Sequence, residues 1–298
     1  MSRGLAAAAL GAALALGLAG ASGAALGQTL PAPAPGCQVA RTFPDVSAPE
    51  GVLVVPVIIH YMLLDLESVP RNAGFNAADN HVPEVLEKAH ELEALFDAPE
   101  PDVARPRRNV NDVWGDYGVR LALVRTERCD FTWADVGQVP VPRPAPTDLT
   151  LFRAVVRRFN TPDFNGLNLY QWPKLGGSVA GYGATPRADG PFPGPGAVWF
   201  HVLTLSQRDS KQGARPRRLV RVMAHEVGHF FSLTHNCGEP RLPGCENHRV
   251  VRTMMNKFYD GTLLSPCKQR KAHQGVAKIT AGTPITTEEE ITCPAAER

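Results

Sequence analysis

The chain alternates continuous apolar runs with segments in which apolar residues recur every three or four positions. A β-branched run from Gly51 to His60 predicts a strand buried on both faces of a sheet. Shorter runs predict further strands at residues 119–125, 167–171 and 197–203. Helical spacing predicts helices at residues 83–96, 149–159, 217–233 and 266–277, with a short helical piece at 110–114. Strands that alternate with helices, followed by a turn-rich C-terminal part, predict an α/β (α+β) fold.

The N-terminus has the pattern of a secretory signal peptide. Arg3 precedes an Ala/Leu/Gly run from Leu5 to Leu18, and small residues follow up to Gly27. The run is shorter than the about 20 residues that a membrane span needs. We therefore expect residues 1–27 to be a signal peptide and the mature protein to be secreted, extracellular or periplasmic, without a transmembrane segment.

The rest of the chain is expected to form one domain. Residues 28–50 are rich in proline and alanine and are interpreted as an extended linker or a short pro-segment. Residues 51–298 follow as a single domain, with an upper lobe to about residue 232 and a small lower lobe over 233–298. The formal net charge of +2 argues against a nucleic-acid partner, because phosphate binding needs a concentrated basic surface. Nothing in the sequence indicates an oligomeric state.

The six cysteines are interpreted as disulfide partners in an oxidising compartment: Cys37, Cys129, Cys237, Cys245, Cys267 and Cys293. Six cysteines allow 15 connectivities, and the sequence does not choose among them. The first local pair to consider is Cys237 with Cys245, and Cys267 with Cys293 would hold the polar C-terminal tail. Alternatively, Cys37 could cap a metal as an inhibitory thiolate, but the even cysteine count favours a disulfide.

A histidine motif carries the candidate chemistry. His225 and His229 stand four residues apart in an HExxH pattern on a predicted helix, so both imidazoles can reach one tetrahedral Zn²⁺. His235 lies ten residues after His225, at the spacing of the longer HExxHxxGxxH pattern. Glu226 lies beside the metal rather than on it, where its carboxylate can act as general base towards an activated water. The other histidines lack ligand spacing and are interpreted as structural.

The segment HEVGHFFSLTH, followed by the residues from Arg252 to Asn256, resembles the metzincin metallopeptidases, most closely the pappalysin and cytophagalysin-like members. Weaker similarity extends over residues 54–60, 111–119, 169–182 and 264–269. The resemblance implies a secreted zinc endopeptidase with Zn²⁺ as cofactor and a peptide or protein as substrate. It also implies a twisted, mixed five-stranded sheet with helices in the upper lobe and the zinc helix at the cleft.

The resemblance assigns further site residues. Met255, or alternatively Met254, would be the methionine of the turn that packs beneath the three imidazoles. An edge strand at the cleft rim, where an extended peptide can add as another strand, would comprise Ser178, Val179, Ala180, Gly181 and Tyr182. The chain departs from the family at Ser232, where a glycine usually leaves the helix with positive φ, and serine there costs about 1 kcal/mol.

Two alternatives remain open at this point. Ser232 motivates the first, a secreted zinc-binding protein of the same fold with little or no peptidase activity. The second takes Glu246 as the third metal ligand in place of His235. It is disfavoured because Glu246 lies in a Pro/Gly/Cys-rich turn rather than on a helix. Calcium is not indicated.

Overall fold

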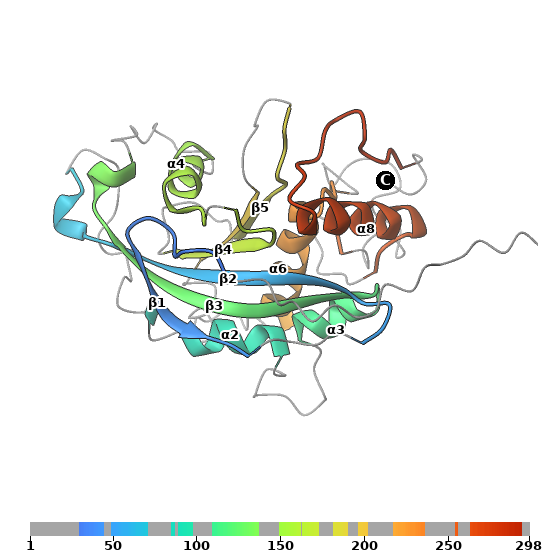
Figure 1. Cartoon of the computed structure of the whole chain (residues 1–298), viewed down its shortest axis with the longest axis horizontal. Helices are drawn as coiled ribbons and strands as arrows, with labels where there is room; N and C mark the ends of the chain where they lie inside the picture. The colour runs from blue at the N-terminus through green and yellow to red at the C-terminus, as the bar shows by residue number, and fades with distance from the viewer. Residues whose placement is uncertain are drawn as a thin grey trace, which may run out of the picture.

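The computed structural model describes residues 30–44, 49–70, 85–86, 89–97, 109–136, 149–161, 163–172, 181–189, 196–201, 217–235, 254–255 and 263–293. A six-stranded mixed sheet lies at the centre of these residues (Figure 1). Its spatial order is β1 (Cys37–Thr42), β3 (Val119–Phe131), β2 (Leu53–Leu64), β4 (Leu167–Trp172), β6 (Ala197–His201) and β5 (Gly181–Ala184). The four inner strands are mutually parallel, and both edge strands run antiparallel to their neighbours.

Helices cover both faces of this sheet. In chain order they are η1 (Leu66–Ser68), α2 (Ala89–Asp97), α3 (Val110–Gly115), η3 (Trp133–Val136), α4 (Leu149–Phe159), α6 (Arg217–Phe230) and α8 (Pro266–Thr280). In Figure 1, α4 lies on the opposite side of the sheet from α2 and α3. Apolar residues of α2, α3, α6 and α8 share one core with alternate residues of β2, and α4 packs in a second core with other residues of β2. A strand buried on both faces, as the sequence predicts for Gly51–His60, is therefore confirmed.

The mixed α/β fold is confirmed, but the expected number of five strands is wrong. The sixth strand, β1, lies within residues 28–50, which were interpreted as an extended linker or pro-segment. Its side chains are mostly exposed, so no hydrophobic run indicates a strand there. Antiparallel pairing with β3 and the Cys37–Cys129 disulfide, whose Cα atoms are 4.2 Å apart, attach it to the sheet.

Two disulfides join described cysteines. The expected pair Cys267–Cys293 is confirmed. Cys37 bonds to Cys129, so the alternative of Cys37 as a metal-capping thiolate is wrong. Cys237 and Cys245 lie outside the described residues.

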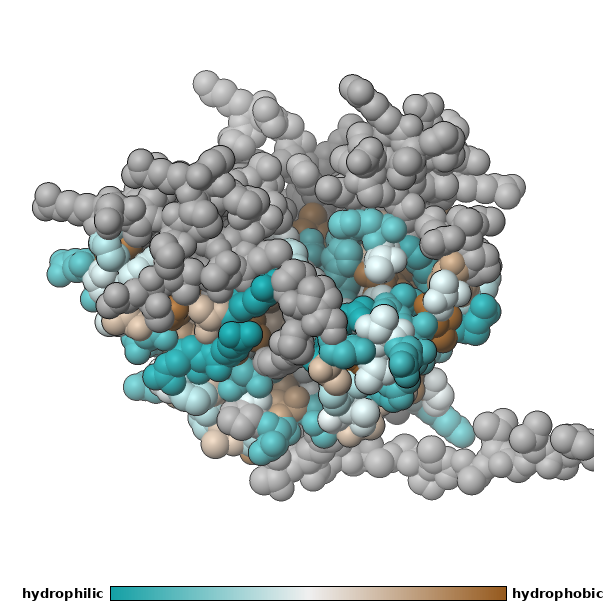
Figure 2. Space-filling view, turned by 90° about the horizontal axis from the view of Figure 1, so that it is seen from above, coloured by the Kyte–Doolittle hydropathy of each residue, from teal (hydrophilic) through white to brown (hydrophobic). Residues whose placement is uncertain are grey.

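The described residues seen in Figure 2 are mostly hydrophilic. On the face shown in Figure 2, apolar residues are scattered among hydrophilic ones. Among the described helices, none has the length and apolar character that crossing a bilayer requires.

Candidate metal centre

Helix α6 carries the HExxH motif, and its apolar face holds it in the core. Five side chains at helical spacing are buried: Val220, Met223, Ala224, Val227 and Phe230. His225 and His229, four residues apart, are only half-buried. Because the apolar face of α6 is buried, the helix cannot rotate, and both imidazoles point away from the core on the same face.

A hydrogen-bonded turn ends α6 and reverses the chain. The N–H of Ser232 donates to the carbonyl of His229 (3.0 Å), and the N–H of Leu233 donates to the carbonyl of Gly228 (2.9 Å). These two bonds form a Schellman motif, which needs a left-handed residue immediately after the helix. Ser232 is that residue, with φ 71°. Serine thus adopts the conformation for which glycine is usually chosen, and the chain turns so that His235 faces α6.

Three imidazole rings converge at this turn. The Nε2 atom of His235 lies 3.1 Å from Nε2 of His225 and 3.0 Å from Nε2 of His229. The Nδ1 atom of His225 faces the carbonyl oxygen of Met254 at 2.7 Å, and Nδ1 of His229 faces that of Leu233 at 2.8 Å. A carbonyl can only accept, so each Nδ1 carries the proton, and each Nε2 presents a lone pair.

This donor set fits a zinc ion. Tetrahedral zinc with Zn–N bonds of about 2.0–2.1 Å requires neighbouring ligand nitrogens about 3.3 Å apart, close to the separations of 3.0 and 3.1 Å. Burial, together with the neighbouring His225 and His235, lowers the pKa of His229 to about 3, so this ring stays neutral, as a ligand must. His225, His229 and His235 therefore form a candidate metal site.

Glu226 lies directly beside the edge strand β5. Burial raises the pKa of Glu226 to about 8, and the nearby backbone N–H of Gly183 opposes this shift. A Cβ on Gly183 would lie 2.1 Å from the carbonyl oxygen of Glu226 and 2.8 Å from Cβ of His229, so only glycine fits there. The hydroxyl of Thr185 also donates to the carbonyl of His229 (2.6 Å), which bonds the chain just after β5 to the same helix.

The two adjacent methionines make different contacts with α6. A Cβ on Gly228 would lie 2.5 Å from Sδ of Met255, so the sulfur packs directly against the helix backbone. Met254 instead supplies the carbonyl oxygen that accepts from His225. Both methionine side chains are buried. Met255 remains the predicted methionine of the turn, and Met254 has a separate part in orienting a ligand.

The other predicted site residues are only partly described. Gly181 and Tyr182 belong to β5, which is an edge strand of the sheet. Ser178, Val179 and Ala180 lie outside the described residues, and so does Glu246.

Two glycines that shape the site, Gly183 and Gly228, were not among the predicted site residues. Gly228 lies inside the predicted helix, and Gly183 directly follows the predicted edge strand. A glycine in a helix or strand lowers stability and often marks a place where another backbone or side chain approaches closely. The partner that approaches is not visible in the sequence, because it lies far along the chain.

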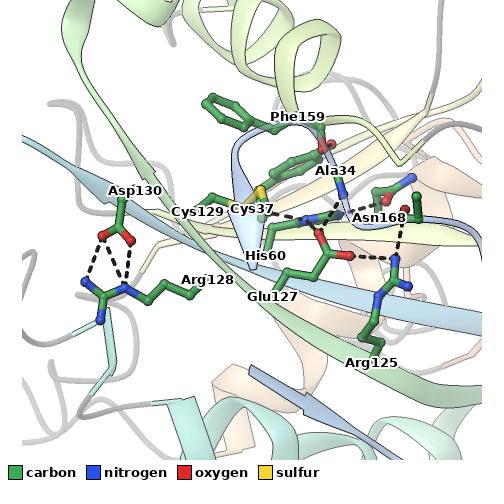
Figure 3. The surroundings of a disulfide bond; sticks show 12 residues. Ala34, Cys37, His60, Arg125, Glu127, Arg128, Cys129, Asp130, Phe159 and Asn168 are labelled. Atoms are coloured by element: carbon green, nitrogen blue, oxygen red, sulfur yellow. Dashed lines mark hydrogen bonds and ion pairs between the residues drawn. A yellow bond between two sulfur atoms is a disulfide. The ribbon is translucent and has the colours of Figure 1, made fainter. Parts of the chain in front are cut away.

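A second cluster of potential ligands surrounds the disulfide Cys37–Cys129 (Figure 3). The carboxylate of Glu127 lies 3.1 Å from Nδ1 of His60 and 2.6 Å from Nη2 of Arg125. Burial favours the neutral carboxyl, but the hydrogen bond and charge of His60 and the charge of Arg125 lower the pKa of Glu127. Both sulfurs are bonded to each other and are not thiolates, so they are not ligands in this state. The cluster is a buried ionic network of the sheet.

The sequence matches no protein-family model, and no curated protein matches it significantly.

Proposed function

We propose that this chain is a secreted, zinc-dependent endopeptidase of the metzincin kind, most like the pappalysin and cytophagalysin-like members. One observation carries the proposal. Three imidazole Nε2 atoms converge at separations of 3.0 and 3.1 Å beside Glu226, with two of the rings oriented by backbone carbonyls. Such carbonyl contacts are the usual support of metal-binding histidines.

The site residues would have two roles, metal binding and proton transfer. His225, His229 and His235 would hold the metal. A zinc ion in such a site supplies Lewis-acid polarisation of the scissile carbonyl and activation of a water molecule. Glu226 would take the proton of the attacking water and pass it to the leaving amine. Burial raises the pKa of Glu226, and a dication held by the three histidines would counter this by favouring the ionised carboxylate that a base requires.

Strand β5 supports a peptide as substrate. It is the last strand of the sheet, and among the described residues only β6 pairs with it. An extended peptide can add to such an edge through backbone hydrogen bonds. Gly183 places this strand directly beside Glu226, so a peptide on this edge would pass the catalytic carboxylate.

The two disulfides support a location outside the cytoplasm. Disulfides persist in oxidising compartments and are rare in the cytosol. This agrees with the signal-peptide pattern of residues 1–27.

Metal analysis and cleavage of a peptide library by the mature chain test the proposal. We expect about one equivalent of zinc in the wild type and in Glu226→Gln, with cleavage only by the wild type, because the substitution removes the base but no ligand. His235→Ala should lose most of its zinc, whereas His90→Ala, which removes an exposed imidazole on α2, should keep it.

Other outcomes contradict the proposal. If the wild type binds zinc but cleaves no more than Glu226→Gln, the chain is a zinc-binding protein without peptidase activity. If Glu246→Ala loses zinc while His235→Ala keeps it, the third ligand is a carboxylate.

A further inference from the structure

The hydroxyl of Ser232 is bonded to the C-terminal tail. Its Oγ donates to Oε1 of Glu290 at 2.6 Å, across 58 residues of sequence. Ser232 is 4% exposed, so water does not compete freely for this hydroxyl. The contact joins the tail to the one residue of the ligand-bearing turn that has a left-handed backbone.

Glu290 is itself firmly held. Lys271 of α8 places Nζ 2.6 Å from Oε1, and Arg187, which follows β5, places Nη2 2.8 Å from Oε2. Burial opposes ionisation of Glu290, but the hydrogen bonds from Lys271, Ser232 and Arg187 prevail and lower its pKa to about 2. The carboxylate is therefore charged at neutral pH, and a hydrogen bond to a charged acceptor is stronger than a neutral one.

Helix α8 holds the same turn from a second side. A Cβ on Gly275 would lie 2.6 Å from the carbonyl oxygen of Phe231, so the helix lies directly on the backbone before Ser232. Nζ of the buried Lys268 donates to the carbonyl of Thr234 (2.7 Å), the residue before His235. The turn between the second and third candidate ligands is thus held by α8 and the tail together.

We infer that Glu290 is a positioning residue for the third metal ligand: its carboxylate holds Ser232 in the left-handed turn that brings His235 to the other two imidazoles. The inference rests on the proposed metal site. It also accounts for a serine where the family resemblance implies glycine. Glycine adopts the turn without strain, whereas serine requires an outside partner that only the hydroxyl can bond.

Comparing serine, alanine and glycine at position 232 distinguishes the effect of backbone strain from the effect of the hydrogen bond to Glu290. Serine is strained and bonded to Glu290, Ser232→Ala keeps the strained backbone but loses the bond, and Ser232→Gly loses both. We expect zinc affinity, measured by competition with a chromophoric chelator, to fall about fivefold in Ser232→Ala, because the bond that offsets the strain is lost. It should stay within about twofold in Ser232→Gly, where the strain and the bond are lost together. The absorption of bound Co²⁺ should lose tetrahedral intensity in Ser232→Ala as His235 is displaced.

Glu290→Gln completes the test in two backgrounds. In the native background it should weaken zinc binding as Ser232→Ala does, and in the Ser232→Gly background it should have little effect. Glu289→Gln, which changes an exposed carboxylate bonded to Lys278 and Thr286, is the matched control and should leave zinc affinity unchanged.

Each remaining outcome has a defined meaning. An equal loss of zinc affinity from Glu290→Gln in both backgrounds shows a general structural role and overturns the inference, while the metal site stands. Equal affinities of the alanine and glycine variants at position 232 overturn it as well, and this comparison keeps Glu290 intact if Glu290→Gln does not fold. A wild type that binds no zinc overturns the metal site and the inference together.

Discussion

Gly183 lies so close to Glu226 that a Cβ on the glycine would come within 2.1 Å of the glutamate's carbonyl oxygen, so the edge strand β5 packs directly on the candidate catalytic residue. The backbone N–H of Gly183 also lies near the Glu226 carboxylate and lowers its pKa. Any displacement of β5 would therefore change the surroundings of Glu226 as well as the edge on which a peptide would bind.

Gly183→Ala should separate β5 from α6. The added Cβ would lie 2.1 Å from a backbone oxygen, so the strand must shift. We expect the free energy of unfolding to fall by about 1–3 kcal/mol and cleavage to fall more steeply than zinc binding. Urea unfolding and zinc competition measure these effects. Gly115→Ala, where a Cβ meets nothing within 4 Å, is the control and should leave stability and cleavage almost unchanged.

Glu127→Gln should strongly destabilise the fold, because it leaves Arg125 and His60 without their carboxylate in a buried site. Losing one partner of a buried ionic network costs about 3–5 kcal/mol. Asp130→Asn, which removes an exposed partner of Arg128 on the same strand (Figure 3), should cost less than about 1 kcal/mol. Chemical denaturation measures the free energy of unfolding of both variants. Similar losses in the two would mean that the buried network contributes little to stability.

Stability should fall in acid partly through Glu290. Its folded pKa of about 2 lies below the ordinary value of 4.5, so its contribution is complete above about pH 5 and is lost as the pH falls towards 2. We expect the wild type to lose about 2 kcal/mol more than Glu290→Gln over this range. Unfolding free energies measured from pH 5 to pH 2.5 give the difference. Parallel curves for the two proteins would contradict the ion pairs of Glu290 with Lys271 and Arg187.

Lys268 should also make stability rise with pH, but in the alkaline range. Burial lowers its pKa to about 8, and the charge of Lys271 contributes, whereas the unfolded chain keeps the ordinary 10.5. The unfolded state therefore binds more protons between these values, so this group makes stability rise with pH from 8 to 10. Relative to Lys268→Met, the wild type should gain about 1–2 kcal/mol over that interval in denaturant titrations. A difference curve that is flat or falls with pH would show that Lys268 is not desolvated.

Most inner strands and helices could be predicted because their apolar residues follow the periods of buried strands and amphipathic helices. Residues 149–159 match α4, and the parallel strand from residue 167 matches β4 within one residue. Strand β1 could not be predicted in this way, because its exposed side chains carry no such period and its place depends on pairing with β3 and on a disulfide across 92 residues.

At the candidate site, the sequence could predict only what is local to α6 and its turn. The spacing of His225, His229 and His235 follows from helix geometry and one reversal of the chain. The partners that fix this geometry come from elsewhere: Gly183 from the sheet edge, Met254 from a later turn, and Glu290 from the tail. Their positions depend on tertiary packing, which a local pattern does not encode.

The Cys37–Cys129 bond has a consequence for proteolysis. It spans 92 residues, so a single backbone cut anywhere between residues 43 and 128 leaves both fragments in one covalent molecule. β1 would also remain paired with β3, since the crosslink lies within that pairing. If copies of the chain cut one another, such nicks would leave the mass on a non-reducing gel unchanged, and separate fragments would appear only after reduction.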